Sequence, residues 1–567
     1  MEILLMKFAL SSLIAILILG TLYSTSAHPQ KRAVVTLSDH IDEALRNRIE
    51  AAEFPPKIMV RSELILASVM LPIFYERRAY KPAWCDENGP SPHGETLLLA
   101  IRLAYREGLR PNDYHLASIE ATLAEIKKNR AQKKLLNLDR LVDLDLLLTD
   151  AFLIYGSHLL AGRINPETID PEWFANRREA DLAAILQSAL DSTTIEESLH
   201  GLLPPQAGYA RLRQALARYR DIAAKGGWPT IPEGPKLQVG DRNERVVLLR
   251  SRLSVTGDLA SRSLNDEELF DYALGEAVRS FQKRNGLESD GVVGPKTLSA
   301  LNIPAEERVR QMEVNMERWR WLPQDLGDRY ILINIANFEL DVLENNTPVM
   351  TMRIVVGRSY RRTPVFSDKM TYLVLNPYWN VPTNIAIEDI VPQVSKDPNY
   401  LAQKNMKVFR GWGADTKEID PTTIDWSKVS KNNFAYRFRQ EPGSSNALGR
   451  IKFMFPNRFN VYLHDTPSRE LFEKNERTFS SGCIRIEKPL DLAEYVMRGD
   501  PLWSREKILV AIERHVEQTV RLPKPLSIHL LYWTAWANED GTVQFRNDIY
   551  GRDTLVDAAL RENPPSS

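Results

Sequence analysis

The spacing of apolar residues changes along this 567-residue chain, and the change limits the folds that it can adopt. Between about residues 56 and 303, apolar residues recur every three or four positions, as in ETLLLAIRLAYREGL, which is typical of helices buried on one face. From about residue 327, apolar and polar residues alternate, as in YILINI, which is typical of strands. Because a chain of this length has room for about three or four domains, the sequence predicts a multidomain α+β protein.

Residues 56–230 are predicted to form an all-helical scaffold domain. LDRLVDLDLLLTDAFLIYGSHLLAG and YARLRQALARYRDIAAKGG both repeat apolar residues at helical spacing and end in glycine, a common helix terminator. The histidines of this region are scattered and lack the spacing of metal ligands. We find no acid and base pair in this domain, so we do not expect it to carry the chemistry.

A second helical unit, residues 236–303, follows the Pro- and Gly-rich boundary WPTIPEGPKLQVGD. Val246, Leu249 and Leu253 lie on one face of its first predicted helix. Its motifs LQVGD, AVRSFQKRNGL and DGVVGPKTLSALN resemble the small three-helix peptidoglycan-binding domain. The resemblance implies that this unit binds the bacterial cell wall.

The β-rich part is expected to form one domain over 327–499. YILINIANFELDVLENNTPVMTMRIVVG predicts a hairpin of two strands around ENNT, and MTYLVLNPYWNVP, GRIKFMFPN and FNVYLHDTP predict further strands. Residues 394–440 are polar and irregular, and a long insertion of this kind often serves as a lid. Residues 500–567 are expected to be a C-terminal extension with one amphipathic helix and a closing hairpin at its DG turn.

Two residues of the β-rich part point to acyl transfer. Cys483 lies in SSGCIR, nineteen positions after His464 at a predicted strand end, and the only other cysteine is Cys85, with which it could pair. A thiol attacks carbonyls as the thiolate, and a neutral imidazole can take its proton. Because glycine has no Cβ, the N–H groups of Gly482 and Cys483 can approach a developing oxyanion. The pattern predicts a cysteine nucleophile with a histidine base.

HDTP followed by SSGCIR resembles the L,D-transpeptidase family, and FYERRAYKPAW, LRPNDYHL, NPYWNVP and TPVFS extend the likeness to its large Gram-negative subgroup. That subgroup combines a helical scaffold, a wall-binding insert and a catalytic domain with a mobile lid. The resemblance implies that Cys483 attacks the diamino acid of a tetrapeptide stem and expels D-alanine. A diamino-acid amine on a neighbouring stem then takes the acyl group, which gives a direct crosslink. A carbapenem is expected to acylate the same thiol.

The resemblance also implies roles for the residues around Cys483. His464 acts as base and then acid, and the backbone carbonyl of Asp465 holds its imidazole. Residues expected to contact substrate are Arg485, Tyr462, Trp379, Asn380 and Ser481. Many family members have histidine at the position of Ser481, so His464 is the only local base here. From the residues alone, Arg485 as a surface ion-pair partner and Trp379 as core packing stay open.

The N-terminal segment predicts export. In residues 1–27, Lys7 precedes an apolar run that is shorter than the roughly 20 residues of a spanning helix and is flanked by small residues. It is either a cleaved signal or an inner-membrane anchor, and in both cases it predicts a periplasmic protein. No membrane contact is expected elsewhere.

The expected partners are peptidoglycan stem peptides, a tetrapeptide donor and a diamino-acid acceptor, and other wall-synthesis proteins. The balance of 73 basic and 74 acidic residues argues against a nucleic-acid binder. No cofactor is expected, and no metal, because the chain has no HExxH motif or Cys/His cluster. Two other functions stay open: hydrolysis by an L,D-carboxypeptidase or wall-release enzyme, and a wall-binding scaffold without catalysis.

Overall fold

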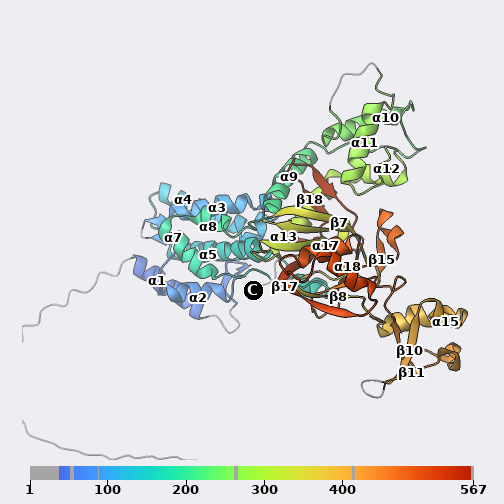
Figure 1. Ribbon diagram of the computed structural model, residues 1–567. Coiled ribbons are helices and arrows are strands. Elements are labelled where there is room, and N and C mark those ends of the chain that lie inside the picture. The colour runs from blue at the N-terminus through green and yellow to red at the C-terminus, as the bar shows by residue number, and fades with distance from the viewer. Residues whose placement is uncertain are drawn as a thin grey trace, which may run out of the picture.

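The computed structural model describes residues 37–51, 57–86, 88–174, 177–260, 266–411 and 416–562 (Figure 1). The predicted export signal lies outside these ranges. Within them, one helix, α5 (Leu138–Ala161), is long and apolar enough to cross a membrane, but nearly all of it is buried inside the protein. Burial on all sides identifies α5 as the core helix of the scaffold.

The N-terminal region is helical, as predicted. Helices surround α5, and the side chain of Asn137 caps its start by accepting a hydrogen bond from the Arg140 N–H. Cys85 is buried and does not pair with Cys483, and burial raises the pKa of its thiol. The other elements of this region are α1 (Leu37–Glu50), β1 (Met59–Val60), β2 (Glu63–Leu64), α2 (Met70–Arg77), β3 (Cys85–Asp86), β4 (Gly89–Pro90), α3 (Pro92–Arg102), α4 (Leu116–Ala131), α6 (Pro166–Ile169), α7 (Leu182–Ser192) and α8 (Ile195–His200).

Helix α9 (Ala207–Ala224) joins the scaffold to the rest of the molecule. Its apolar side chains pack with those of α13 (Ala305–Arg320) and of the C-terminal hairpin formed by β18 (Ala535–Ala537) and β19 (Val543–Phe545). This core is separate from the core around α5. At this junction Trp319 stacks on Trp533 with ring centroids 4.2 Å apart. The last predicted scaffold helix therefore also supports the β-rich part.

The second helical unit, residues 236–303, contains the three predicted helices, α10 (Glu244–Val255), α11 (Tyr272–Arg284) and α12 (Pro295–Leu301). Val246, Leu249 and Leu253 are fully buried in a core that the unit shares only with Ile231 of the segment before it. Figure 1 shows the unit at the opposite end of the molecule from most of the scaffold helices.

The β-rich part is a nine-stranded sheet in the order β15-β7-β16-β14-β13-β8-β17-β5-β6, and an additional pairing of β7 with β6 closes it. Its strands are β5 (Arg329–Asn334), β6 (Glu339–Glu344), β7 (Thr347–Gly357), β8 (Phe366–Leu375), β13 (Ile451–Met454), β14 (Leu463–His464), β15 (Thr478–Ser480), β16 (Ile484–Ile486) and β17 (Gln518–Leu531). The predicted two-stranded hairpin is three strands, because a turn at Ile335–Asn337, with Phe338 at a φ of 56°, separates β5 from β6.

The C-terminal segment corrects the predicted boundary at residue 499. Strand β17 lies inside the sheet, parallel to β5 and antiparallel to β8. Its alternating apolar side chains, such as Ile528 and Leu530, are buried in the same core as the other strands. The described part of the segment after residue 499 therefore adds a strand to this sheet as well as forming the expected helix. The other C-terminal elements are α17 (Pro489–Val496), α18 (Arg505–Glu513), β18 (Ala535–Ala537), β19 (Val543–Phe545) and α19 (Arg552–Arg561).

We expect Ile528→Ala to lower the free energy of unfolding by about 2–5 kcal/mol, because it leaves a cavity beside a fully buried position of β17. Thr519→Ala, at an exposed position of the same strand, is the matched control and should change it by no more than about 0.5 kcal/mol. Urea unfolding followed by tryptophan fluorescence measures both. Equal midpoints for the two variants would contradict the placement of β17 in the core.

The insertion between β8 and β13 is an ordered unit, here called the lid unit (residues 379–440). It contains a second sheet, in the order β11-β10-β12-β9, and its own apolar core. Described residues of the segment 394–440, which was expected to be irregular, thus form helices and strands, and the amphipathic segment before it belongs to the same core. In Figure 1 the lid unit projects away from the closed sheet. Its elements are β9 (Trp379–Asn380), α14 (Thr383–Ile385), a π-helical turn (Ala386–Ile390), α15 (Val391–Lys396), α16 (Tyr400–Gln403), β10 (Met406–Arg410), β11 (Lys417–Ile419) and β12 (Tyr436–Gln440).

Candidate active site

Strand pairing gathers the predicted catalytic residues on one face of the closed sheet. Strands β14 and β16 are parallel, with Leu463 opposite Ile484, and both of these side chains are fully buried in the core. Because side chains alternate along a strand, their neighbours project from the other face. Those neighbours are Tyr462, His464, Cys483 and Arg485.

Lys452 joins this face and was not found from the sequence. It lies opposite His464 in the antiparallel pairing of β13 with β14. Its Nζ lies 3.8 Å from the centre of the Tyr462 ring, a cation–π contact. The alternation in GRIKFMFPN places Lys452 on the face opposite Ile451 and Phe453, but no local pattern shows that β13 pairs with β14.

His464 is held as a neutral imidazole. Its side chain is buried, and its Nδ1 lies 2.6 Å from the backbone carbonyl oxygen of Asp465. A carbonyl can only accept, so Nδ1 carries the proton and Nε2 keeps its lone pair. Burial, helped by the positive charge of Arg485, lowers the pKa of His464 to about 3. The imidazole is therefore neutral at rest, with Nε2 unprotonated.

The Cys483 thiol is half-buried and forms no disulfide. Burial raises its pKa, whereas hydrogen bonds from the backbone N–H and hydroxyl of Tyr462, and the charges of Lys452 and Arg485, lower it in part. The raised pKa favours the protonated thiol at rest. The surrounding donors and cations can stabilise the thiolate once a base removes that proton.

The loop that carries Cys483 is shaped by glycine and a buried serine. Gly482 has a φ of 109°, a conformation that a residue with a Cβ rarely adopts. The Ser480 hydroxyl accepts from the Gly482 N–H at 3.1 Å and donates to the Cys483 carbonyl at 2.5 Å. The Gly482 N–H, expected to face an oxyanion, is thus engaged, whereas no residue in the described ranges accepts from the Cys483 N–H. The Cys483 N–H is the better placed donor.

Arg485 has no ion-pair partner among the described residues, and its Nε is buried without a hydrogen-bond partner there. Burial lowers the pKa of its guanidinium, with a further contribution from Arg358. A cation beside the thiol that forms no ion pair with a described residue suits a substrate carboxylate better than a role as a surface ion-pair partner.

The remaining predicted contact residues lie around the lid unit. Trp379 and Asn380 form β9, opposite Gln440 and Arg439 of β12, and Trp379 packs against the core of the lid unit. They are therefore not in the sheet that carries Cys483. The hydroxyl of Ser481 accepts a hydrogen bond from Arg361 Nη1 at 2.8 Å. Arg361 was not predicted from the sequence.

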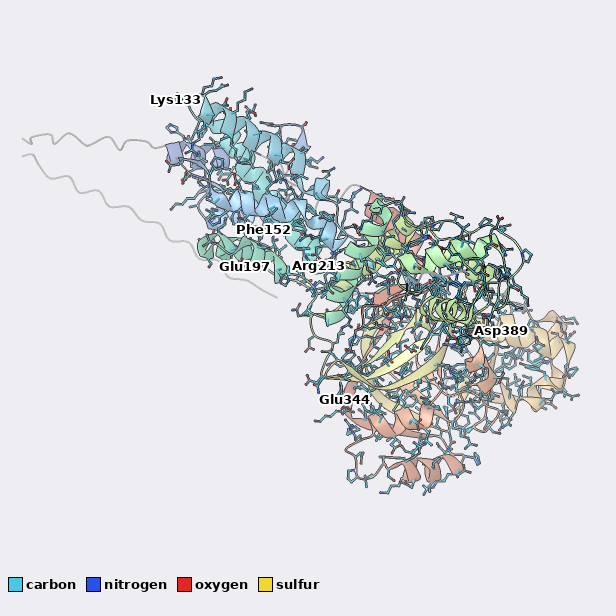
Figure 2. The ribbon with its side chains drawn as sticks, turned by 90° about the horizontal axis from the view of Figure 1, so that it is seen from above. Lys133, Phe152, Glu197, Arg213, Glu344 and Asp389 are labelled. Atoms are coloured by element: carbon cyan, nitrogen blue, oxygen red, sulfur yellow. The ribbon has the colours of Figure 1, made fainter. Side chains whose placement is uncertain are left out.

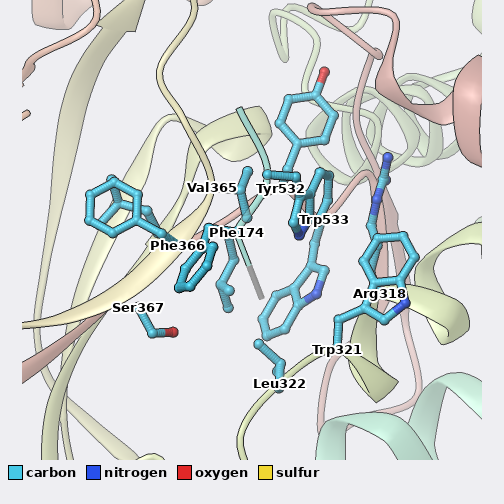
Figure 3. Close-up of a pocket in the computed structure, with 12 residues that line it drawn as sticks. Phe174, Arg318, Trp321, Leu322, Val365, Phe366, Ser367, Tyr532 and Trp533 are labelled. Atoms are coloured by element: carbon cyan, nitrogen blue, oxygen red, sulfur yellow. The ribbon is translucent and has the colours of Figure 1, made fainter. Parts of the chain in front are cut away.

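A buried cavity elsewhere is too small for a peptide. Phe174, Trp321, Phe366 and Trp533 are among the residues that line it (Figure 3), and its volume is about 20 Å³. A space of that size holds about one water molecule. Among the described residues, no group of three or more His, Cys, Asp or Glu side chains is placed to hold a metal ion.

Comparison with known protein families assigns three parts of the chain. Residues 70–216 match the family described as a scaffold domain, residues 242–301 the family described as "Putative peptidoglycan binding domain", and residues 328–504 the family described as an L,D-transpeptidase catalytic domain. The fold predicted from the sequence is confirmed at this level. The third match ends before β17 begins.

Two curated relatives are similar over part of the chain. A protein of Haemophilus influenzae named "Putative L,D-transpeptidase" is 35% identical over 299 residues, which cover 52% of this chain and 58% of that protein. The N-acetylmuramoyl-L-alanine amidase CwlM of Mycobacterium tuberculosis is 39% identical over 80 residues, 13% of this chain and 20% of that protein. The chain thus spans less than two thirds of either relative.

Two solved structures share a distant likeness. An L,D-transpeptidase of Xylanimonas cellulosilytica is 16% identical, with a TM-score of 0.15, over 53% of this chain and 99% of that one. The Ldtfm-avibactam carbamoyl enzyme is 10% identical, with a TM-score of 0.17, over 41% of this chain and 64% of that one. At these TM-scores the likeness supports no conclusion about this chain.

Proposed function

Because the chain carries an L,D-transpeptidase catalytic domain together with a peptidoglycan-binding domain and a scaffold domain, we propose that it crosslinks peptide stems of the bacterial cell wall through a Cys483 acyl-enzyme. One observation carries the cysteine mechanism. Cys483 projects from the same face as His464, whose imidazole is neutral and oriented by the Asp465 carbonyl. The pair supports general-base activation of a thiol.

In the proposed first step, His464 Nε2 takes the proton of the thiol as Sγ bonds to the carbonyl carbon of the third stem residue. The Cys483 N–H donates to the oxyanion that forms, a contribution of roughly 3–4 kcal/mol in hydrolases. The imidazolium then gives its proton to the departing amine of D-alanine. A thioester between Cys483 and the shortened stem results.

In the proposed second step, the side-chain amine of a diamino acid on a neighbouring stem attacks the thioester. His464 takes a proton from that amine, and Sγ leaves as the thiolate, stabilised by the Tyr462 hydroxyl and the Lys452 and Arg485 charges. The product is a direct diamino-acid-to-diamino-acid crosslink. Water in place of the amine gives hydrolysis.

The lack of an ion-pair partner for Arg485 among the described residues supports recognition of a stem carboxylate, and Tyr462 flanks the thiol on the same face. Lys452 adds a second cation. We propose that Trp379 and Asn380 contact substrate only from the side of the lid unit. Ser481, whose hydroxyl accepts from Arg361, is proposed to order the loop before Cys483.

Domains that act on peptidoglycan indicate a location outside the cytoplasm. We propose the periplasm, with residues 1–27 as a cleaved signal or an inner-membrane anchor. Other wall-synthesis proteins are proposed partners on the same ground.

The proposed function is tested by incubating the purified protein with a disaccharide tetrapeptide and analysing products by mass spectrometry. We expect release of D-alanine and a dimer with a direct diamino-acid link. Tripeptide monomer as the sole product would replace the proposal with an L,D-carboxypeptidase. Wall binding without any reaction would favour a scaffold that lacks catalysis.

Deleting residues 236–303 is expected to lower activity on intact peptidoglycan more than activity on small soluble stems. The deleted unit has a separate core, so the closed sheet keeps its own core without it. Release of D-alanine from both substrates measures the effect. An equal loss on the two substrates would argue against a targeting role for this unit.

A further inference from the structure

One arginine contacts both the loop that carries Cys483 and the lid unit. Arg361 lies between β7 and β8, and its side chain is only 9% exposed. Its Nη1 donates to the Ser481 hydroxyl at 2.8 Å and lies 2.5 Å from a carboxylate oxygen of Asp389. Its Nη2 also pairs with Glu388. Glu388 and Asp389 belong to the π-helical turn of the lid unit, and Figure 2 labels Asp389 where that unit meets the rest of the protein.

The backbone around Arg361 is fixed to the Cys483 loop. The Arg358 N–H donates to the Ser480 carbonyl at 3.0 Å, and the Thr363 hydroxyl donates to the Gly482 carbonyl at 2.9 Å. These bonds lie on either side of Arg361. Its guanidinium therefore has a defined position relative to Ser481 and, two residues on, to Cys483.

The lid unit has few other charged contacts with its surroundings. Among ion pairs between described residues, those of Arg361 and one at the end of the unit, between Arg439 and Glu441, join the lid unit to a residue outside it. The lid unit also has its own sheet and core, so its internal packing does not depend on the closed sheet. Through the Arg361 contacts, the position of the lid unit can therefore affect the loop that carries Cys483.

We propose that Arg361 is a positioning residue that couples docking of the lid unit to the alignment of Cys483. When Glu388 and Asp389 are in place, the Arg361 guanidinium contacts both carboxylates and the Ser481 hydroxyl. The hydrogen bond to Ser481 then orders the loop that precedes Cys483. When the lid unit moves away, Arg361 loses two carboxylates at once, and its bond to Ser481 is no longer constrained. This inference rests on the proposed role of Cys483 as the nucleophile.

The test compares three variants of the full chain. Arg361→Met removes the whole contact, and Glu388→Gln with Asp389→Asn removes only its lid side. Arg353→Met is the matched control, because Arg353 also binds two carboxylates, those of Glu473 and Glu487, but contacts neither Ser481 nor the lid unit. We expect kcat for D-alanine release to fall about tenfold to a hundredfold in the first two variants, with little change in KM, since misplacing a reacting group costs about that much.

Hydrogen exchange and thiol alkylation provide readouts that do not need turnover. Exchange over residues 383–396 should rise in the first two variants and stay unchanged in Arg353→Met. The rate at which iodoacetamide alkylates Cys483 should change in the same two variants only. Faster exchange without any change in alkylation or kcat would overturn the coupling. If the wild-type protein releases no D-alanine, the proposed function fails, whereas exchange and alkylation still decide the role of Arg361.

Discussion

Replacing Cys483 with alanine is expected to abolish the acyl-enzyme and to lower D-alanine release by about 10⁴-fold or more, the scale seen when a nucleophile is removed from a catalytic set. The hydroxyl groups described around this face are poorly placed to take over. The Ser480 hydroxyl is bonded within the loop and that of Ser481 to Arg361. Burial and the neighbouring thiol hold the pKa of the Tyr462 hydroxyl well above its usual range.

Intact-mass analysis after incubation with a carbapenem or a tetrapeptide stem measures this prediction. The wild-type protein should gain the mass of the acyl group, and Cys483→Ala should not. Cys85→Ala is the control, because Cys85 is buried in the scaffold and its substitution should leave the adduct in place. Binding to isolated peptidoglycan should survive in both variants. An adduct on Cys483→Ala would show that another residue is the nucleophile.

The candidate site could be predicted from the sequence where it depends on short motifs. HDTP and SSGCIR identified His464 and Cys483, and strand alternation explains why both project from one face once β14 pairs with β16. Lys452 and Arg361 could not be predicted in the same way. Arg361 lies 120 positions from Ser481, and no local spacing indicates that the two side chains meet.

The fold was predictable at the level of domains, because helical and alternating patterns extend over long segments. The prediction failed where strands are short or lie far in the sequence from the strands with which they pair. Strand β17 follows a helix, and its position in the sequence suggests a C-terminal extension, although it lies between β8 and β5 in the sheet. The lid unit reads as irregular because its strands have two to five residues, too few for alternation to emerge from a polar background.

Removing the base is expected to have the second largest effect. In His464→Asn, the shorter amide can still donate to the Asp465 carbonyl, but no atom replaces Nε2. We expect acylation of Cys483 to fall by about 10²–10⁴-fold, the usual contribution of a positioned general base. The Arg353→Met variant removes ion pairs with Glu473 and Glu487 but no contact of Cys483 or His464, so it should acylate at the wild-type rate.

The pH dependence separates this role from a structural one. Because the pKa of His464 is lowered to about 3, the imidazole stays neutral from pH 5 to 8, and wild-type acylation should be nearly constant over that range. Without the base, the rate should follow ionisation of a thiol whose pKa is raised, and so increase about tenfold per pH unit. Stopped-flow acylation by a carbapenem measures both profiles. Two parallel profiles that differ only in height would mean that His464 orders the site but does not take the proton.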